Sequence, residues 1–371
     1  MLDIKYHLKK DRRREQFRPD RPLPFGQLRS DHMFLMDFNW EEGWHDARIV
    51  PYANLSIAPG AKILHYGQGI FEGEKAFKHT DGEIYMFRPD MNSVRRNQSA
   101  DMCCMPDIPI ENQIQAKKAL IDVDRLWYPE QEGASFYVRP FSFGTEDSLG
   151  VKPSLTYTYC IILSPSGSYY PGGFEPIKLL LTDKHKRVGP KGMGQAKTGG
   201  NYNGSLKAGK KAAESDAKQV LYLDVFDRWL EEAGAMNHFH VTGDGEIIIP
   251  TFTDTILESI TSKSFIELSE MGMLPYTVRQ ENILALDFVI DLALKGITEA
   301  GGLGTAAVVS PVGSYGIDIG ERIREKERVL IVGDGKVGPV TRDMYDLYTK
   351  IQRGRVEAPE GWLNLVERIN T

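Results

Sequence analysis

The sequence predicts an α+β protein of two domains. At 371 residues the chain exceeds the size at which a single hydrophobic core usually stops growing. Strand-like and helix-like segments occur in both halves, without the regular alternation that a doubly wound parallel sheet requires. A proline and glycine cluster, PSGSYYPGG at residues 165–173, separates two strand-like segments. We therefore expect a smaller domain with an N-terminal arm at residues 1–165, a linker at 166–175 and a larger domain at 176–371.

The first half contains two expected strands and one expected helix. EIYMF at residues 83–87 and LTYTYCIILS at 155–164 show the alternation and β-branched content of strands. MNSVRRNQSADMC at 91–103 reads as a helix that Pro106 ends. Adjacent residues of a helix point about 100° apart. If Arg95 faces inward, we expect Arg96 to face solvent or an ion partner.

In the second half, the expected strands and helices alternate less regularly. IKLLLT at residues 177–182 and VLYLDV at 220–225 predict strands, and HFHVTGDGEIIIP at 238–250 predicts a hairpin that turns at Gly243–Gly245. NGSLKAGKKAAESDA at 203–217 and TRDMYDLYTKIQ at 341–352 predict helices. The segment SITSKSFIELSEMG at 259–272 resembles a helix start, where free backbone amides favour an anion.

Composition excludes several classes of protein. Hydrophobic residues make up 41% and charged residues 26% of the chain, and the net charge is −6. This balance is typical of a globular protein and gives no broad positive field for nucleic acid. No apolar run approaches the roughly 18 residues of a membrane span, and the charged N-terminus lacks the features of a secretory signal. Three cysteines, Cys103, Cys104 and Cys160, are too few for a disulfide framework, so we expect a cytoplasmic protein.

Two motifs resemble known binding sites, one for a dinucleotide and one for a metal ion. Gly333, Gly335 and Gly338 follow an apolar strand in GxGxxG spacing, but no second strand and acidic residue follow, as a dinucleotide-binding unit requires. His238 and His240 alternate on one strand face and could share a metal ion, yet no third ligand accompanies them at a recognisable spacing. A satisfied or surface histidine pair is the better interpretation, and we expect no metal site.

Lys197 is the strongest candidate for chemistry. It lies in GMGQAKTGGNYNG, between glycine pairs, just before a predicted helix. Glycine allows close approach of the backbone to a ligand, and a lysine presented on such a loop suits covalent catalysis by an amine. A surface turn with an incidental lysine is the alternative, and this segment alone does not decide between them.

Six segments in order along the chain carry a resemblance. They are HYGQGIFEGEKAF, FRPDMNSVRRNQSA, YVRP, AKTGGNY, EEAGAMN and GLGTAAVVSPVG. Together they closely resemble the branched-chain amino acid aminotransferases, which are fold type IV enzymes dependent on pyridoxal 5'-phosphate. The resemblance implies the two-domain architecture of D-amino acid aminotransferase, with the cofactor in the interdomain cleft.

The resemblance assigns the cofactor contacts. Lys197 would bind the cofactor covalently and then act as a general base, which requires a pKa well below that of an ordinary lysine. Glu232 would hold the pyridine nitrogen. Arg95 would bind the phosphate, because a guanidinium matches phosphate oxygens. The remaining implied contacts are Ile260, Thr261 and Thr305 to the phosphate and Tyr202 to the ring hydroxyl. Here LESIT replaces the usual Pro-Gly before Thr261, so the shape of that loop is open.

The resemblance also assigns substrate contacts and partners. The substrates would be the branched L-amino acids leucine, isoleucine and valine together with 2-oxoglutarate and glutamate. Tyr66, Phe71 and Tyr137 would form walls of the pocket, and Arg139 would bind the distal carboxylate of glutamate. Ala306 and Ala307 would offer backbone amides to a carboxylate. A homodimer is expected. The rivals are a D-amino acid aminotransferase, an aminodeoxychorismate lyase and a cofactor-binding protein without catalysis.

Overall fold

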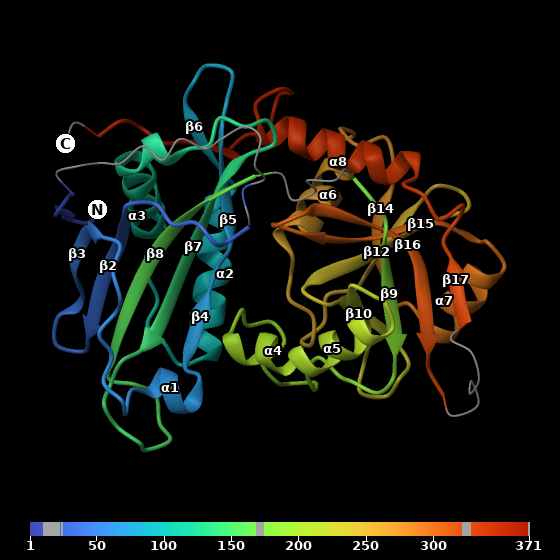
Figure 1. The fold of residues 1–371 in the computed structure, drawn as a ribbon, viewed down its shortest axis with the longest axis horizontal. Helices are drawn as coiled ribbons and strands as arrows, with labels where there is room; N and C mark the ends of the chain where they lie inside the picture. The colour runs from blue at the N-terminus through green and yellow to red at the C-terminus, as the bar shows by residue number, and fades with distance from the viewer. Residues whose placement is uncertain (10–22, 24, 168–173, 321–327, 370–371) are drawn as a thin grey trace. The chain divides into compact units, whose positions relative to one another are not determined.

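The chain forms two compact units. The computed structural model describes residues 1–9, 23, 25–167, 174–320 and 328–369 (Figure 1). Unit 1 comprises residues 1–171, 196–199 and 350–371, and unit 2 comprises residues 172–195 and 200–349. Segments 196–199 and 350–371 therefore group with unit 1, whereas the sequence-based division placed them in the second domain. Residues 168–173 of the expected linker, and 10–22 and 24 of the expected arm, lie outside the described residues.

Unit 1 is built on a largely antiparallel sheet. In spatial order its strands are β1 (Lys5–Tyr6), β3 (Gly43–Pro51), β2 (His32–Asn39), β8 (Thr156–Ser166), β7 (Ser135–Gly144), β5 (Glu74–Lys78), β6 (Ile84–Phe87) and β18 (Leu363–Leu365), with β4 (Gly69–Phe71) paired to β7. The helices are α1 (Lys62–Tyr66), α2 (Pro89–Met102) and α3 (Ile110–Val123), followed by the 3₁₀ turn η1 (Arg125–Trp127).

The two faces of the unit 1 sheet differ in chemistry. Phe136 and Val138 of β7 pack in a core cluster with Ala116 and Leu120 of α3. Successive side chains of a strand point to opposite faces, so Tyr137 and Arg139 project from the other face. The sheet therefore separates an apolar core from a polar and aromatic surface on which site residues lie.

Unit 2 contains a sheet that closes on itself. In spatial order its strands are β11 (Leu230–Ala233), β10 (Gln219–Leu223), β9 (Ile177–Thr182), β16 (Val308–Asp318), β15 (Ile297–Gly304), β12 (Met236–Thr242), β13 (Ile247–Pro250) and β14 (Val278–Glu281), with β17 (Arg328–Ile331) paired to β16. β11 also pairs with β12, which closes the ring. The remaining helices are α4 (Gly199–Gly204), α5 (Leu206–Glu214), α6 (Ile260–Glu270), α7 (Ala285–Ala293) and α8 (Pro339–Gln352).

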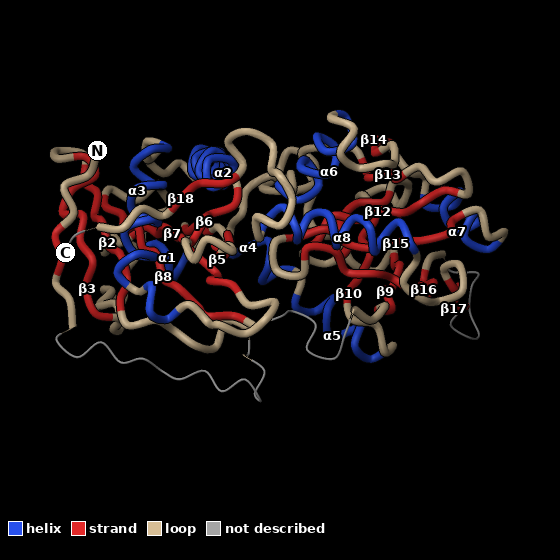
Figure 2. The backbone as a smooth tube through the Cα atoms, turned by 90° about the horizontal axis from the view of Figure 1, so that it is seen from above, coloured by secondary structure: helices blue, strands red, loops and turns tan. Residues whose placement is uncertain are grey.

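Alternation along β9 explains how helices cover both faces of this sheet. Leu180 packs with Ala208 and Ala212 of α5, whereas its neighbours Leu179 and Leu181 pack in the cluster that contains α7. Thus α5 and α7 lie against opposite faces (Figure 2). A strand that is buried on both faces is apolar along nearly its whole length. The sequence of β9, IKLLLT, follows this rule.

The expected α+β class is confirmed, as are the strand at residues 177–182 and the hairpin of β12 and β13. The prediction of one continuous helix at residues 203–217 is wrong. These residues contain the end of α4 and, beyond Ser205, helix α5. After β17, Gly333 and Gly335 have φ of 53° and 80°, and they turn the chain toward α8. Within the described part of the chain, no helix is both long and apolar enough to cross a membrane.

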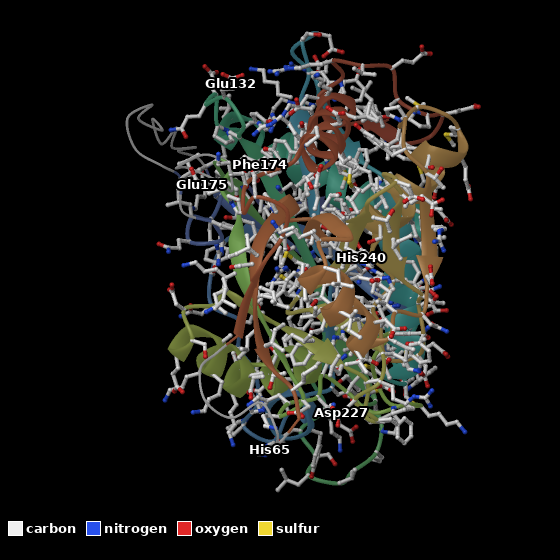
Figure 3. All side chains as sticks on the ribbon, turned by 90° about the vertical axis from the view of Figure 1, so that its right-hand side faces the viewer. His65, Glu132, Phe174, Glu175, Asp227 and His240 are labelled. Atoms are coloured by element: carbon white, nitrogen blue, oxygen red, sulfur yellow. The ribbon has the colours of Figure 1, made fainter. Side chains whose placement is uncertain are left out.

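The two histidines of β12 are buried, which corrects the alternative of a surface pair. His238 is 0% and His240 is 7% exposed. Figure 3 labels His240 among the side chains. The His238 Nε2 atom lies 2.8 Å from the Tyr315 hydroxyl, and Phe288 of α7 contacts both rings. Neither Nδ1 atom has a hydrogen-bond partner among the described residues. No group of three potential metal ligands occurs among the described residues.

We predict that His240 makes the fold sensitive to acid. Burial, aided by the charge of Arg279, lowers the pKa of His240 from 6.5 to about 4. Between these pH values the unfolded chain binds a proton that the folded chain does not, so stability falls as the pH is lowered through this window. The loss is about 3 kcal/mol. His240→Leu should reduce the loss measured by urea unfolding between pH 7 and pH 4.

Phe239→Leu is the matched control, because Phe239 is buried on the same strand and cannot titrate. It should lower stability equally at both pH values. An unchanged pH dependence in His240→Leu would contradict the assignment.

Candidate functional site

The backbone of Lys197 is fixed within unit 1. Its amide donates to the Ser99 hydroxyl of α2 at 2.9 Å, and its carbonyl accepts from the Phe71 amide of β4 at 3.0 Å. The following residue, Thr198, bridges to Ile70 and donates to the Gly69 carbonyl at 2.7 Å. The lysine therefore extends from a segment held between a strand and a helix, and its Nζ atom lies 5.2 Å from the centre of the Phe71 ring.

Arg95 forms a buried, bidentate ion pair. Its Nε and one terminal nitrogen donate to the two carboxylate oxygens of Glu72, both at 2.8 Å, and the Asn92 amide donates to the same carboxylate at 2.8 Å. Burial favours the neutral acid, but the charge and hydrogen bonds of Arg95, with the charge of Lys197 and the Asn92 bond, outweigh it and lower the pKa of Glu72. The Lys197 amine and the Arg95 guanidinium thus share one carboxylate environment.

Phe71, Tyr137 and Arg139 form a second cluster in unit 1. The Arg139 guanidinium lies 4.9 Å from the Phe71 ring centre and 5.2 Å from that of Tyr137, and it donates to the Tyr137 hydroxyl at 2.9 Å. Gly73 is required here, because a Cβ atom would lie 2.1 Å from that hydroxyl. The cluster combines aromatic walls with a fixed positive charge.

Tyr66 and Arg96 each have contacts of their own. Tyr66 is 43% exposed, and its hydroxyl donates to the Leu149 carbonyl. Arg96 was expected to face solvent or an ion partner, which is wrong. It is 2% exposed, donates to the Pro106 carbonyl and the Ser142 hydroxyl, and burial lowers its pKa to about 10. Both arginines are therefore buried, Arg95 against Glu72 and Arg96 against Pro106 and Ser142.

Unit 2 holds a buried carboxylate that we call the Glu232 clamp: Glu232 with Arg187, Leu257 and Asn237. Glu232 is 3% exposed, and one of its oxygens pairs with the Arg187 Nε atom. Its other oxygen accepts from the Leu257 amide at 2.9 Å and from the Asn237 side chain at 3.1 Å. Arg187 also donates to the Thr255 carbonyl at 2.6 Å. A buried carboxylate with these donors is stabilised in its charged form.

Asn237 connects the clamp to the start of α6. Its side-chain oxygen accepts from the Ser259 amide at 3.3 Å and from the Ser262 hydroxyl at 2.9 Å. Ser259 caps the helix by accepting from the Ser262 amide at 3.3 Å. The amides of Ile260 and Thr261 have no acceptor among the described residues. Although LESIT replaces the usual Pro-Gly at this point, α6 still begins with a cap and two free amide donors. Such a helix start favours the binding of an anion.

The hairpin between β15 and β16 lies beside this group. Asn237 of β12 pairs with Leu303 of β15, and Gly304 pairs with Val308 across the turn formed by Thr305, Ala306 and Ala307. The turn therefore follows directly from the strand that neighbours Asn237. Tyr202 lies in α4, and its carbonyl accepts from Ser205. The structure thus brings Glu232, the α6 start and the turn together in unit 2, and Lys197, Arg95, Phe71, Tyr137 and Arg139 together in unit 1.

Comparison with known proteins identifies the family. The profile of the family Amino-transferase class IV matches residues 69–289. The chain belongs to the class IV aminotransferases. It is 42% identical over 343 residues to branched-chain-amino-acid transaminase 1 of Bacillus subtilis, covering 92% of this chain and 93% of that protein. It is 43% identical over 342 residues to branched-chain-amino-acid aminotransferase 2 of the same organism, covering 92% of this chain and 91% of that one.

Solved structures show the same fold. The branched-chain amino acid aminotransferase of Escherichia coli aligns with a TM-score of 0.71 at 26% identity, over 91% of this chain and 99% of that one. That of Thermobaculum terrenum, in its PLP form, aligns with a TM-score of 0.73 at 22% identity, over 92% of this chain and 100% of that one. The fold type IV assignment is confirmed. Class IV aminotransferases are pyridoxal phosphate enzymes.

The residues of this class IV aminotransferase fit such a cofactor. A pyridine nitrogen that carries a proton needs a carboxylate, and Glu232 is a buried carboxylate held by Arg187. A phosphate needs donors and positive charge, and the free amides of Ile260 and Thr261 at the start of α6 supply donors. Arg95 is a buried guanidinium, and Lys197 supplies a primary amine.

Sequence reasoning missed four residues that position this site. Asn237 and Glu72 lie inside the quoted segments EEAGAMN and FEGEK, so closer attention to buried polar residues could have found them. Ser99 also lies inside a quoted segment, FRPDMNSVRRNQSA, but its contact with Lys197 joins segments far apart in the sequence. Arg187 lies outside the quoted segments, and it acts through a contact with the distant Glu232.

We predict that Glu72→Ala destabilises the protein by about 3–5 kcal/mol, because it leaves the buried charge of Arg95 uncompensated. The matched control is Glu367→Ala, which removes the pair with Lys118 at a carboxylate that is 63% exposed. Such an exposed pair contributes about 0–1 kcal/mol. Urea unfolding of both variants checks the difference, and equal losses would contradict the importance of the buried pair.

Proposed function

We propose that the chain is a branched-chain amino acid aminotransferase that depends on pyridoxal 5'-phosphate. It would transfer the amino group of L-leucine, L-isoleucine or L-valine to 2-oxoglutarate, giving the branched 2-oxo acid and L-glutamate. The observation that carries the proposal is the set of buried, charged residues described above, found in a chain 42% identical to a branched-chain-amino-acid transaminase over 92% of its length. Small-molecule substrates are expected, with no nucleic acid or membrane partner.

Each residue has a role that its surroundings support. The cofactor, when bound, withdraws electrons from the substrate Cα atom, which weakens the bond to its proton. Lys197 would hold the cofactor covalently through its Nζ atom and, when that amine is free of the link, would carry the proton of the substrate Cα atom. Glu232, paired with Arg187, would accept a hydrogen bond from the protonated pyridine nitrogen. Tyr202 donates to the ring hydroxyl.

The phosphate contacts come from both units. Arg95 contributes charge, with its direction fixed by Glu72. Ile260 and Thr261 contribute the free amides at the α6 start, and Thr305 contributes its hydroxyl from the β15–β16 turn.

The substrate pocket must accept an apolar branched side chain and, in the second half-reaction, a carboxylate. Phe71 and Tyr137 supply apolar ring surface, and the Arg139 guanidinium against both rings supplies the charge for the distal carboxylate of glutamate. Tyr66 would form a further wall, and Ala306 and Ala307 would donate to the α-carboxylate through their amides.

We propose that the enzyme is at least a homodimer in the cytoplasm. Several apolar side chains around α1 and the loop before β8 are exposed, namely Leu64, Tyr66, Leu149, Val151 and Leu155. Exposed apolar groups of this kind are typical of a protein interface. The cysteines of the described chain are free, as expected in a reducing compartment.

Lys197→Ala should lower kcat by at least about 10³-fold, because both the covalent link and the base are lost. The visible absorption of the bound cofactor should also disappear or shift. Lys207→Ala, at an exposed position of α5, is the control and should retain activity. Retained turnover in Lys197→Ala would disprove the assignment of this lysine.

Arg139→Gln should weaken the half-reaction with 2-oxoglutarate more than that with leucine. A hydrogen bond to a charged group contributes about 1.5–3 kcal/mol, so kcat/KM for 2-oxoglutarate should fall about 10- to 150-fold. Leucine has no distal carboxylate and serves as the internal control. Equal losses for both substrates would assign Arg139 to folding and not to recognition.

Sedimentation velocity tests the proposed assembly. The full-length protein should sediment as a dimer or a larger assembly while active. Val151→Asp, which places a charge on the exposed apolar set, should shift it toward the monomer. An active monomer at all concentrations would refute the proposal.

A further inference from the structure

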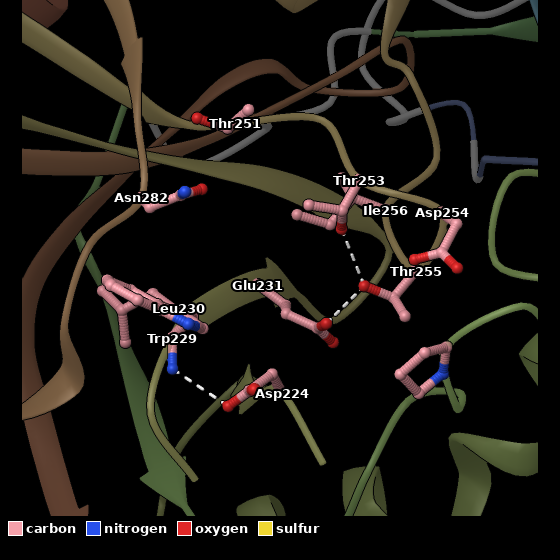
Figure 4. Close-up of a pocket in the computed structure, with 11 residues that line it drawn as sticks. Asp224, Trp229, Leu230, Glu231, Thr251, Thr253, Asp254, Thr255, Ile256 and Asn282 are labelled. Carbon is pink, nitrogen blue, oxygen red and sulfur yellow. Dashed lines mark hydrogen bonds between the residues drawn. The ribbon is translucent and has the colours of Figure 1, made fainter. Parts of the chain in front are cut away.

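A cavity of about 200 Å³ lies in unit 2 beside Glu231 of β11 (Figure 4). Eleven residues line it: Pro190, Asp224, Trp229, Leu230, Glu231, Thr251, Thr253, Asp254, Thr255, Ile256 and Asn282. Glu232 is not among them. Glu231 lines this cavity, whereas the Glu232 carboxylate is bonded by Arg187, the Leu257 amide and Asn237. The site is therefore separate from the one proposed for the cofactor.

Glu231 is a buried carboxyl group that forms no ion pair with the described residues. It is 4% exposed. One of its oxygens accepts from the Thr255 hydroxyl, and the other has no hydrogen-bond partner among the described residues. Burial raises the pKa of Glu231, despite the hydrogen bond from Thr255 and the charges of Arg187 and Lys186. A buried carboxylate with an unsatisfied oxygen is costly unless a donor reaches it.

The rest of the lining is rich in oxygen atoms. The Thr255 hydroxyl is 2.9 Å from that of Thr253, so a row of polar groups runs from buried Glu231 to exposed Thr253 (Figure 4). None of the described residues that line the cavity is lysine, arginine or histidine. Such a lining disfavours an anion, and it disfavours an amino acid because no side chain would pair with its carboxylate.

Apolar groups also line the cavity. Leu230 and Ile256 are buried, Trp229 is half-buried, and Pro190 adds a ring. The volume is far larger than a bare metal ion needs, and no cluster of three metal ligands is present among the described residues. The cavity therefore combines a carboxylate at its floor with space and apolar contacts for a few carbon atoms.

Glu231 and Glu232, the two carboxylates on β11, are connected through Thr255. Thr255 bonds Glu231 through its hydroxyl and Arg187 through its carbonyl, and Arg187 pairs with Glu232. Whatever occupies the cavity thus contacts residues that also support the clamp.

We propose that this cavity binds a small alkylammonium ion, with its N–H group on Glu231 and its alkyl groups against Leu230, Ile256 and Trp229. The inference does not depend on the proposed enzymatic function, because it concerns binding at a site that Glu232 does not line.

Calorimetric titration of the full-length protein with trimethylammonium tests the proposal. This cation has one N–H donor and cannot condense with an aldehyde to an imine, so a bound cofactor does not consume it. Four non-hydrogen atoms can support a dissociation constant down to about 0.1 mM, and we expect binding at one site between about 0.1 and 10 mM. The neutral isostere tert-butanol should bind at least tenfold more weakly.

Glu231→Gln should weaken trimethylammonium binding at least tenfold, whereas Glu214→Gln, at an exposed position of α5, should not change it. If Glu231→Gln does not fold by circular dichroism, Asn282→Trp provides the second test. Asn282 is exposed and lines the cavity, so a bulky ring there should block entry, and Asn203→Trp is its matched exposed control.

Three results would overturn the proposal. These are no binding by the wild-type protein, equal binding of trimethylammonium and tert-butanol, and unchanged binding in a folded Glu231→Gln variant. Binding of potassium ions without binding of trimethylammonium would also overturn it, because the site would then accept an inorganic cation.

Discussion

The buried carboxylate of Glu232 is the constraint on which the unit 2 site depends. A charge that is 3% exposed persists when donors replace the water it has lost, and here three segments supply them: Arg187, the Leu257 amide and Asn237. Asn237 then fixes Ser259 and Ser262, and with them the start of α6. The position of the free amides of that helix therefore follows from the need to satisfy one carboxylate.

Unit 1 also contains a buried charge that a partner compensates, but there the buried charge is positive. Arg95 is buried, and Glu72 compensates it through two hydrogen bonds. This pair fixes the direction of a guanidinium that would otherwise have several rotamers. Lys197 is positioned differently, through its main chain, by Ser99 and Phe71. The side chain thus extends from a fixed backbone, which suits an amine that must hold a cofactor and then carry a proton.

The local sequence was enough to predict those helices and strands whose pattern of apolar residues is strong. β9 falls on the predicted residues 177–182, because a strand buried on both faces is continuously apolar. The helix expected at 203–217 is interrupted at Ser205, which periodicity does not reveal. Arg96 was misplaced because its partners, Pro106 and Ser142, come from other segments. Arg187 was missed for the same reason: a contact between distant segments leaves no local signal, whereas Lys197, Glu232 and Arg95 lie in recognisable motifs.

The proposed function assigns both sets of residues to a reaction of branched L-amino acids. Half-reaction spectroscopy of the purified enzyme, loaded with pyridoxal phosphate, tests it most directly. Each of L-leucine, L-isoleucine and L-valine, added without 2-oxoglutarate, should convert the visible absorption of the cofactor to that of its pyridoxamine form, and 2-oxoglutarate should then restore it. Conversion by D-alanine, with none by the three L-amino acids, would contradict the account.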